Sequence, residues 1–443
     1  MKKLFFFFLL SFCAPFAFLT AQQVDELLSD ELVRGLYELP DVVFVKADRQ
    51  GDYGTVYELR VKQPIDHKDE SKGYFYQRVF LTHVGFDKPM VICTEGYMRP
   101  SNRLYELTEM LGANQLDVEH RYFGVSLPHH AQPETQEYWQ YLNLEQETAD
   151  LHHVRSLLGK LYRGHWLSTG ISKGGETTIY YRYFYPDDVA VSVPYVAPLT
   201  QAYEDPRIYA FLDTMGSEEC RRKILAYQKY MLKNRDQVLP RLKWYAKGGG
   251  NKFTYLSLEQ AFEYAVLEYP FSLWQMGFGC EAVPEGLKKQ PIDELTAHLM
   301  EVADLSFWDD EHLELFGPHY YQAATEMGYY GYETKNFKGL LKALPLSPNP
   351  HAAFVPYKLD VKRDFSLAKD AFKWVRENGN RFIYIYGEID TWTSAGVPPS
   401  DQVDALWIYV KGADHRKARI RYMSEEQKKA VKEALTRWLS EKN

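Results

Sequence analysis

The segment "WLSTGISKGGETTIYY" (residues 166–181) constrains the fold more than any other stretch of the chain. An apolar run leads into Gly170-x-Ser172-x-Gly174, and a helix-like pattern follows, which predicts a strand, a tight turn and a helix in that order. The two glycines allow the backbone to approach closely around a strained residue. This context is typical of a nucleophile elbow, which exposes a serine at the end of a strand.

The rest of the chain surrounds this segment with alternating strands and helices. Two segments alternate apolar and polar residues, as in a half-buried antiparallel sheet, and shorter apolar runs are typical of buried parallel strands. The expected strands span 53–63, 74–84, 88–97, 114–124, a run ending at Ser172, 189–198, 381–386 and 405–410. Helices are predicted at 103–112, at 142–162, and from the elbow to about Tyr185. This order predicts an α/β protein with a doubly wound, mostly parallel sheet.

The sequence pattern changes between residues 200 and 370, where apolar residues at helical spacing and many aromatic residues replace the strand patterns. Strands return after this block, and the chain ends in a helix whose "SEEQ" start at Ser424 predicts a capping box. Val431, Leu435 and Trp438 are expected on its inward face. We therefore predict a signal peptide at 1–21, a sheet core in two parts at 22–199 and 371–443, and a helical cap inserted at 200–370.

The first residues, "MKKLFFFFLLSFCAPFAFLTAQQ", have the layout of a secretory signal peptide with cleavage near Ala21. The apolar run is short for a membrane span, and no later stretch is long enough for one. The chain is therefore expected to be exported, to the periplasm or beyond. Loss of Lys2 and Lys3 would change the formal charge from −8 to about −10 (−8 minus 2), and this unclustered acidic balance argues against a nucleic-acid partner.

Three cysteines remain after export. In an oxidising compartment Cys220 and Cys280 are candidates for a disulfide across a 60-residue loop (280 minus 220). Cys93 lies in an apolar run and is expected to be a buried small residue. Their spacing predicts no zinc site, and no metal is expected.

A base and an acid to activate Ser172 are expected in loops after two later strands. The α/β-hydrolase order is serine, acid, histidine. Asp390 follows the strand at 381–386, and His415 follows the strand at 405–410. Because parallel strands end at one edge of a sheet, the three side chains should converge there. A serine needs a base that accepts its proton, and the base needs an orienting carboxylate.

Other residues compete for these roles. Glu388 and Asp414 are alternative acids, although Asp414 is too near His415 in sequence for the usual geometry. Ser126 also follows a glycine, but Pro128 stands where a second small residue is expected. The histidine pairs at 129–130 and 152–153 are expected at the surface.

An oxyanion hole is expected from backbone N–H groups near the elbow. Lys173, directly after the serine, would supply one, and Gly96 or Tyr97 in "CTEGY" the other. The Lys173 side chain is expected to be solvated or ion-paired. Glu95 has two interpretations: a structural ion pair, or a partner for a substrate ammonium.

Several motifs together resemble one family. "GISKGG", "CTEGY", "DVEHRYFGVSLP", "LNLEQETADLHHVRSLL", "YGEIDTW" and "GADHRKARI" are similar to motifs of secreted bacterial tripeptidyl and tetrapeptidyl aminopeptidases, many of them prolyl-specific. "EHRYFGVSLP" and "LEQETAD" also resemble the related lysosomal Pro-X carboxypeptidase and dipeptidyl peptidase family. The likeness runs from about Gln63 to His415, without a matching motif in the cap block. Arg416 departs from it, because a small residue is expected after the histidine.

The resemblance implies an α/β-hydrolase core with a helical cap and no cofactor. It implies Ser172 as nucleophile, Asp390 as acid and His415 as base, acting on peptides with free N termini. A carboxylesterase or lipase on the same fold is the alternative enzyme, and a non-catalytic binding protein is the alternative outside enzymes.

Overall fold

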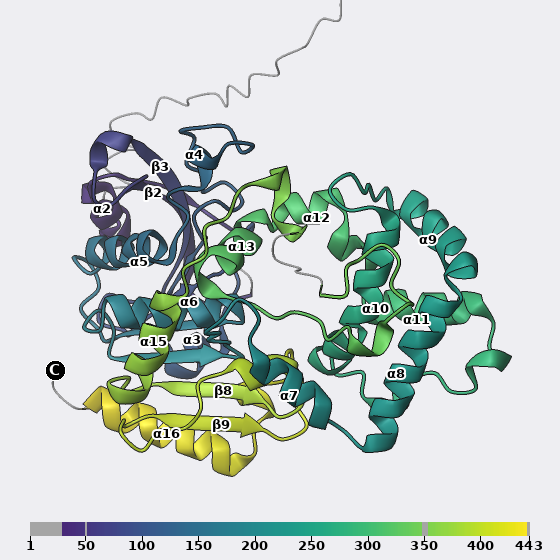
Figure 1. Ribbon diagram of the computed structural model, residues 1–443. Coiled ribbons are helices and arrows are strands. Elements are labelled where there is room, and N and C mark those ends of the chain that lie inside the picture. Colours follow the sequence, from purple (N-terminus) through teal and green to yellow (C-terminus); the bar gives the residue numbers. More distant parts are fainter. Residues whose placement is uncertain (1–28, 49–50, 348–352, 441–443) are drawn as a thin grey trace, which may run out of the picture.

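The computed structural model describes residues 29–48, 51–347 and 353–440. Its centre is a nine-stranded sheet in the order β1-β2-β3-β5-β4-β6-β7-β8-β9 (Figure 1). The strands are β1 (Val42–Lys46), β2 (Thr55–Pro64), β3 (Tyr74–His83), β4 (Met90–Thr94), β5 (Asn114–Val118), β6 (Trp166–Ile171), β7 (Val191–Tyr195), β8 (Ile383–Gly387) and β9 (Leu406–Val410). The predicted signal peptide at 1–21 lies outside the described residues.

The sheet is antiparallel at one side and parallel through the rest. β1, β2, β3 and β5 pair antiparallel, whereas β5, β4, β6, β7, β8 and β9 are parallel. All residues of β4, β5, β7 and β8 are buried, as expected for strands covered on both faces. The predicted doubly wound α/β-hydrolase sheet is confirmed.

Two details differ from the sequence prediction. The strand expected at 114–124 ends at Val118, because the next residues, Glu119, His120 and Arg121, bury polar groups that bond outside the strand ladder. β1 was not predicted; its residues are half-buried or exposed at the sheet edge, so its pattern is weak.

Helices cover both faces of the sheet. Their bounds are α2 (Glu31–Glu38), α3 (Glu106–Leu111), α5 (Leu144–Leu158), α6 (Lys173–Phe184), α15 (Ser366–Glu377) and α16 (Glu425–Ser440). α3 and α16 pack in one apolar cluster with the sheet, and α2, α5, α6 and α15 pack in clusters with other strand residues. Val431, Leu435 and Trp438 are buried, and Ser424 and Gln427 form the predicted reciprocal cap.

Between β7 and β8, every described regular element is helical. The α-helices are α7 (Pro206–Thr214), α8 (Glu218–Lys233), α9 (Arg235–Gly249), α10 (Leu258–Gln275), α11 (Ile292–Val302), α12 (Asp310–Leu315) and α13 (Gly317–Gln322), before α15. We call this segment, residues 200–370, the helical insertion. Its expected end at residue 370 falls inside α15, and the division into core and cap stays a prediction.

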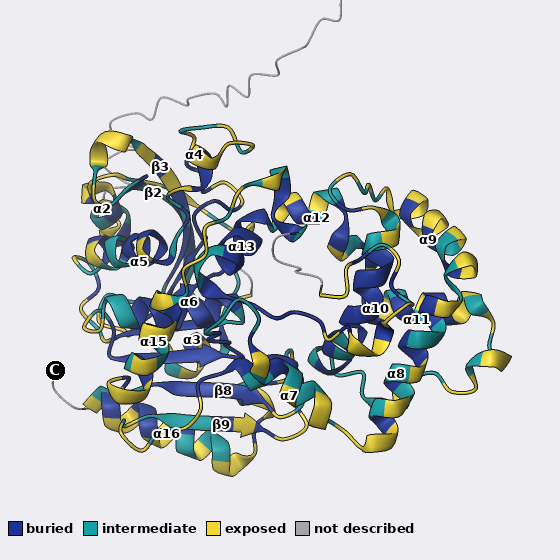
Figure 2. Ribbon diagram, in the orientation of Figure 1, coloured by how far each residue is buried: buried dark blue, intermediate teal, exposed yellow. Residues whose placement is uncertain are grey.

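α10 is the central helix of the insertion. Its residues are largely buried, whereas α9 carries exposed residues on the outside (Figure 2). Ser257 and Gln260 form a capping box at its start. Pro270 lies inside the helix and lacks the N–H that would bond the carbonyl of Val266. The side-chain amide of Gln228 donates to that carbonyl at 2.7 Å, so the proline leaves no acceptor without a partner.

A disulfide bond links two segments of the helical insertion, between the two cysteines that the sequence analysis named as candidates. Cys220 in α8 is bonded to Cys280, and their Cα atoms lie 5.5 Å apart. Cys93 in β4 is a free, buried thiol. Among the described residues, no helix combines the length and the apolar character needed to cross a bilayer.

The "EHRYFG" and "LEQETAD" motifs meet in a buried ion pair. Arg121 is fully buried, and its Nε and Nη2 each donate to an oxygen of Asp150 on α5 at 2.7 Å. Its Nη1 donates to the carbonyls of Ile65 and Tyr141 at 3.1 and 2.9 Å. One guanidinium therefore ties β2, the loop after β5 and α5 together.

We expect Arg121→Ala to lower the free energy of unfolding by about 3–5 kcal/mol, because the buried Asp150 would lose the guanidinium and keep only its contact with His67 at 2.7 Å. Arg60→Ala is the matched control: Arg60 pairs with Glu58 at 2.6 Å but is one-third exposed, so about 0–1 kcal/mol is expected. Urea unfolding of both variants measures the difference. Equal losses would contradict the structural role assigned to Arg121.

Candidate active site

Ser172 lies at the turn between β6 and α6. Its backbone has φ 60° and ψ −123°, a strained conformation for a residue with a side chain. Its N–H donates to the carbonyl of Tyr195 at 2.9 Å. A Cβ at Gly170 would lie 2.2 Å from the carbonyl oxygen of Gly174, and one at Gly174 would lie 2.4 Å from that of Thr94. Both glycines of the motif are therefore required by close backbone approach.

Asp390 and His415 are in contact. Asp390 follows β8 and is fully buried, and His415 follows the neighbouring strand β9. The Nδ1 of His415 donates to Oδ2 of Asp390 at 2.7 Å. The other carboxylate oxygen accepts the N–H of Trp392 at 3.1 Å, which fixes the acid in its loop. Among the described residues the Nε2 of the imidazole forms no hydrogen bond, so it can bind a second partner.

The structure thus places Ser172, Asp390 and His415 after parallel strands of one sheet. Within the described part of the chain, the Ser172 hydroxyl makes no hydrogen bond to His415. Such catalytic contacts are often long without substrate and shorten when it binds.

The competing residues have other partners. The exposed Glu388 accepts the N–H of Gly412 at 2.7 Å, and Asp414 accepts those of Arg416 and Lys417, each at 2.8 Å. Ser126 is fully buried, donates to Glu119 at 2.8 Å and accepts the N–H of Arg78. These contacts are structural.

The histidine pairs also lie in other hydrogen bonds. His129 is exposed, and the ring of His130 contacts the carbonyl of Glu137 at 3.0 Å. His152 and His153 are part-buried and bond to Asp188 and Gln63 at 2.8 and 2.7 Å. The surface position expected for these pairs therefore holds for His129, whereas His152 and His153 are part-buried because α5 packs against the core.

The loop containing Gly96 and Tyr97 lies against the elbow. β4 and β6 are paired so that Cys93 is opposite Thr169, which brings the ends of both strands together. A Cβ at Gly96 would lie 2.7 Å from Cβ of Lys173 and 2.8 Å from N of Gly174. Only glycine therefore lets this loop approach the residue after Ser172.

The Lys173 side chain is buried and ion-paired. Its Nζ lies 3.1 Å from Nε2 of His120 and 3.9 Å from Glu147 of α5. His120 also contacts Glu147. Burial alone would raise the pKa of Glu147, but His120 and Lys173 hold it well below its usual range. This cluster fixes the start of α6 behind Ser172. The sequence analysis missed it, although His120 lies in the "EHR" motif and Glu147 in the "LEQE" motif.

Glu95 lies in a separate ion-pair network. It contacts Arg99 at 2.5 Å, Arg103 at 3.2 Å and the hydroxyl of Tyr105. Although burial alone would raise its pKa, the two arginines keep it below the usual value. Glu95 does not line the cavity beside Ser172. Its surroundings favour the ion-pair interpretation over a substrate-binding role.

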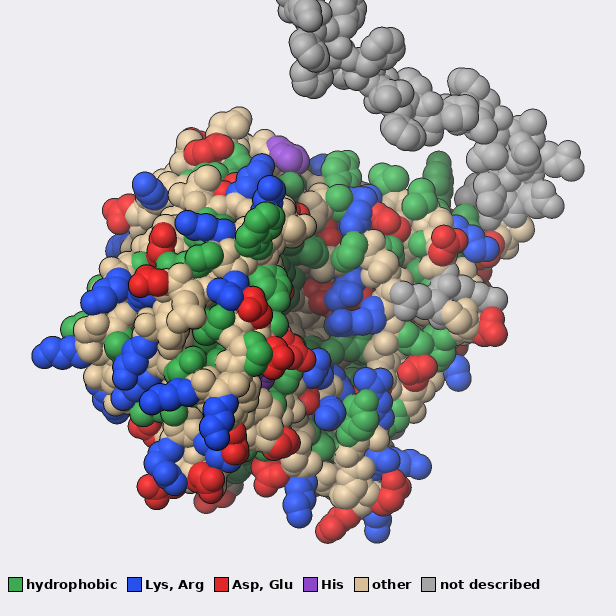
Figure 3. Space-filling model, turned by 90° about the vertical axis from the view of Figure 1, so that its right-hand side faces the viewer, with side chains coloured by type: hydrophobic (Ala, Val, Ile, Leu, Met, Phe, Trp, Pro, Cys, Tyr) green, Lys and Arg blue, Asp and Glu red, His purple; other side chains and the backbone are tan. Residues whose placement is uncertain are grey.

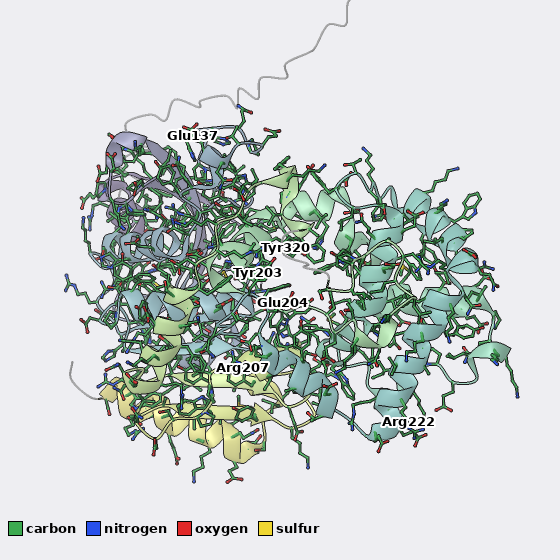
Figure 4. All side chains as sticks on the ribbon, viewed as in Figure 1. Glu137, Tyr203, Glu204, Arg207, Arg222 and Tyr320 are labelled. Atoms are coloured by element: carbon green, nitrogen blue, oxygen red, sulfur yellow. A yellow bond between two sulfur atoms is a disulfide. The ribbon has the colours of Figure 1, made fainter. Side chains whose placement is uncertain are left out.

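Arg207, at the start of the insertion, secures the loop that carries Asp390. It donates to the carbonyls of Leu199, Ala395 and Gly396 at 2.8, 3.2 and 2.9 Å. Figure 4 places Arg207 where α7 meets the sheet. The segment after β7 and the loop after β8 are therefore held together by one side chain, which the sequence analysis did not identify.

A cavity of about 500 Å³ opens beside Ser172. The core contributes Tyr97, Ser172, Lys173 and Glu176, and α10 and the segment after α13 form much of the opposite wall. Arg416, the residue that departs from the family motif, also lines the cavity and donates to the carbonyl of Met276 at 2.6 Å. Figure 3 shows one face of the molecule hollowed near its centre, with hydrophobic side chains inside and charged ones around the rim.

Two buried carboxyl groups line this cavity. Burial raises the pKa of Glu176 on α6 well above its usual value. Burial also raises the pKa of Glu268 on α10, to about 7, against hydrogen bonds that lower it. No group of three or more His, Cys, Asp or Glu side chains suited to a metal ion occurs in the part of the chain that the structure describes.

Known proteins resemble this chain in sequence and in fold. Residues 30–438 match the family described as PS-10 peptidase S37. The prolyl tri/tetrapeptidyl aminopeptidase of Streptomyces mobaraensis is 31% identical over 431 residues, which cover 95% of this chain and 87% of that protein.

Solved structures with a similar arrangement include a proline iminopeptidase from Mycobacterium smegmatis, at 12% identity and a TM-score of 0.41, covering 86% of this chain and 98% of that one. A thermostable carboxyl esterase from Bacillus coagulans has 11% identity and a TM-score of 0.38, covering 87% and 99%. The sequence matches confirm the resemblance drawn from the motifs: the chain belongs to the PS-10 family of S37 serine peptidases.

Proposed function

We propose that this peptidase is exported and releases tri- or tetrapeptides from free N termini, with a preference for proline before the scissile bond. The observation that carries the proposal is the contact between His415 and Asp390, after neighbouring parallel strands, at the edge where Ser172 sits in its strained turn. The name of the Streptomyces mobaraensis relative supports the substrate class.

In the proposed mechanism, the Ser172 hydroxyl attacks the carbonyl carbon while His415 Nε2 takes its proton. Asp390 stabilises the resulting imidazolium. The negative charge on the carbonyl oxygen is bound by the N–H of Lys173 and by that of Gly96 or Tyr97. His415 then gives the proton to the leaving amine, which leaves an ester between the released peptide's C-terminal carbonyl and Ser172. A water molecule, activated by His415, hydrolyses this ester.

Two further observations support the finer parts of the proposal. Aromatic rings line the cavity, among them Phe271, Tyr330 and Trp392, which offer an apolar surface for a proline ring. The signal-like N terminus and the disulfide between Cys220 and Cys280 both fit an oxidising compartment outside the cytoplasm.

A panel of chromogenic substrates tests this function: Ala-Ala-Pro-anilide with a free amine, its N-acetyl derivative, the same peptide with Ala for Pro, and a short-chain ester. We expect efficient cleavage of the free prolyl peptide and at least a tenfold loss in kcat/KM for each of the other peptides. Equal cleavage of the N-acetyl peptide would overturn the exopeptidase assignment, and turnover of the ester alone would identify an esterase.

A further inference from the structure

One face of α10 forms a wall of the cavity beside Ser172. Glu268, Phe271, Ser272 and Gln275 all line the cavity. The last three follow Glu268 by three, four and seven residues, and this spacing places all four on the same side of a helix. Near its end this helix bonds both catalytic loops: the carbonyl of Phe271 accepts from Thr391, and that of Gln275 from the N–H of His415, each at 3.0 Å.

Glu268 is a buried carboxyl group without a cationic partner among the described residues. It accepts from the hydroxyls of Ser272, Tyr330 and Tyr332 at 2.7, 2.8 and 2.9 Å. The other deeply buried acid of this helix, Glu263, instead pairs with Arg235 and accepts backbone N–H groups. A buried carboxylate held only by neutral donors, with a cavity in front of it, is suited to a cation brought by a ligand.

We propose that Glu268 binds the α-ammonium group of the peptide's N terminus, and so confines cleavage to a fixed number of residues from that end. This inference rests on the proposed function and names the residue that gives it exopeptidase specificity. The three hydroxyl donors position the carboxylate, and the ammonium supplies the charge that the protein does not.

The length of α10 between Glu268 and Gln275 agrees with a tripeptide. Seven residues of helix rise about 10 Å, and an extended peptide spans about 3.3–3.6 Å per residue. The N–H of His415 bonds to the carbonyl of Gln275, so Gln275 marks the position of the catalytic loop along α10. The rise of about 10 Å from Glu268 to Gln275 therefore corresponds to about three extended residues between the bound ammonium and the scissile bond.

Other carboxyl groups of the cavity are less well placed. Glu176 follows Ser172 by four residues on α6, which is about 6 Å and shorter than two extended residues. An ammonium at Glu176 would favour release of single residues. Glu301 and Asp304 also line the cavity but are exposed, so water competes with them for a cation.

Glu268→Gln tests the inference, with Glu301→Gln as the matched control at an exposed position of the same cavity. The glutamine oxygen still accepts from the tyrosines, but the charge is lost. We expect KM for Ala-Ala-Pro-anilide to rise roughly 10- to 100-fold, with kcat little changed. Glu301→Gln should change KM less than threefold. In the Ser172→Ala background, Glu268→Gln should weaken binding of Ala-Ala-Pro by the same factor, without affecting N-acetyl-Ala-Ala-Pro.

A series of di-, tri- and tetrapeptidyl anilides provides the second readout. The wild-type enzyme should prefer the tripeptidyl substrate, and Glu268→Gln should reduce that preference at least tenfold. Loss of the preference in Glu176→Gln or Glu301→Gln, but not in Glu268→Gln, would overturn the inference. The proposed function fails separately, if the wild-type enzyme cleaves no free-amino peptide.

The pH dependence gives a third readout. Since burial raises the pKa of Glu268 to about 7, its carboxylate forms as the pH rises through 7, while the substrate amine loses its proton near pH 8. The ratio of affinities for free and N-acetyl peptide, in the Ser172→Ala background, should rise from pH 6 to 7.5. Glu268→Gln should abolish this rise; a rise that persists would contradict the assignment.

The tyrosines near Glu268 do not explain such a rise. The phenols that interact with it all have pKa values raised by burial, so they remain neutral in this range; they are Tyr320, Tyr329, Tyr330 and Tyr332. The other titratable or charged groups lining the cavity are Tyr97, Lys173, Glu176, Glu301, Asp304, His319 and Arg416. Measuring the same pH dependence in Glu176→Gln and Glu301→Gln distinguishes the titration of these two glutamates from that of Glu268.

Discussion

Ser172→Ala is expected to lower kcat/KM for Ala-Ala-Pro-anilide by at least about 10⁴-fold, because the proposed covalent intermediate forms on the Ser172 hydroxyl. The midpoint of thermal unfolding should stay within about 2 °C, since the Ser172 hydroxyl makes no hydrogen bond to His415 and alanine keeps the backbone intact. Steady-state kinetics and calorimetry measure both quantities. A serine-directed phosphonate should add its mass to the wild-type protein and not to the variant.

Ser126→Ala is the control for this prediction. Ser126 is buried and bonds to Glu119, so its loss should lower stability by about 1–3 kcal/mol while leaving phosphonate labelling intact. If Ser172→Ala kept its activity and Ser126→Ala lost it, the nucleophile would be assigned wrongly.

Asp390→Asn is expected to lower kcat by about 10⁴-fold. The carboxylate accepts the Nδ1 proton of His415 at 2.7 Å, and an amide NH₂ in that place favours the opposite tautomer, which has no base at Nε2. Kinetics across pH 6–9 measure the effect, with phosphonate labelling slowed by a similar factor. Because Asp390 also accepts the N–H of Trp392, circular dichroism and the unfolding midpoint must accompany the assay.

Glu388→Gln provides the matched comparison, two residues away. Glu388 is exposed and contacts only a backbone N–H among the hydrogen bonds described, so less than a threefold change in kcat is expected. A larger loss in Glu388→Gln than in Asp390→Asn would assign the acid to Glu388.

The parts of the site that the sequence predicted are those set by local pattern and by strand order. The elbow is local, because Gly170 and Gly174 flank Ser172 within one turn. Asp390 and His415 were placed by the rule that parallel strands end at one edge, and the structure brings them into contact. Once Cys93 was assigned to a buried strand, Cys220 and Cys280 were the two cysteines left to form a disulfide, and the structure joins them.

The parts that sequence did not predict depend on packing between distant segments. Lys173 was expected to be solvated or ion-paired, and its burial follows from His120 and Glu147, which come from two other elements. Glu268 lies in an ordinary helical pattern. It differs from Glu263 in contacting Tyr330 and Tyr332 instead of an arginine, and these contacts arise only in the folded chain. Glu95 was open to two interpretations, because its arginine partners acquire meaning only when the loop is folded.

The bonds from α10 to the loops of Asp390 and His415 bear on how variants of this enzyme can be engineered. A chimaera could exchange the insertion for that of a relative, with junctions before β8. It would also replace the end of α10, whose carbonyls accept hydrogen bonds from Thr391 and His415. Grafting for a new substrate range should therefore retain the last two turns of this helix and recombine only the parts beyond them. The helix that carries Glu268 is therefore joined to the loops of Asp390 and His415 through main-chain carbonyls, which side-chain substitutions do not remove.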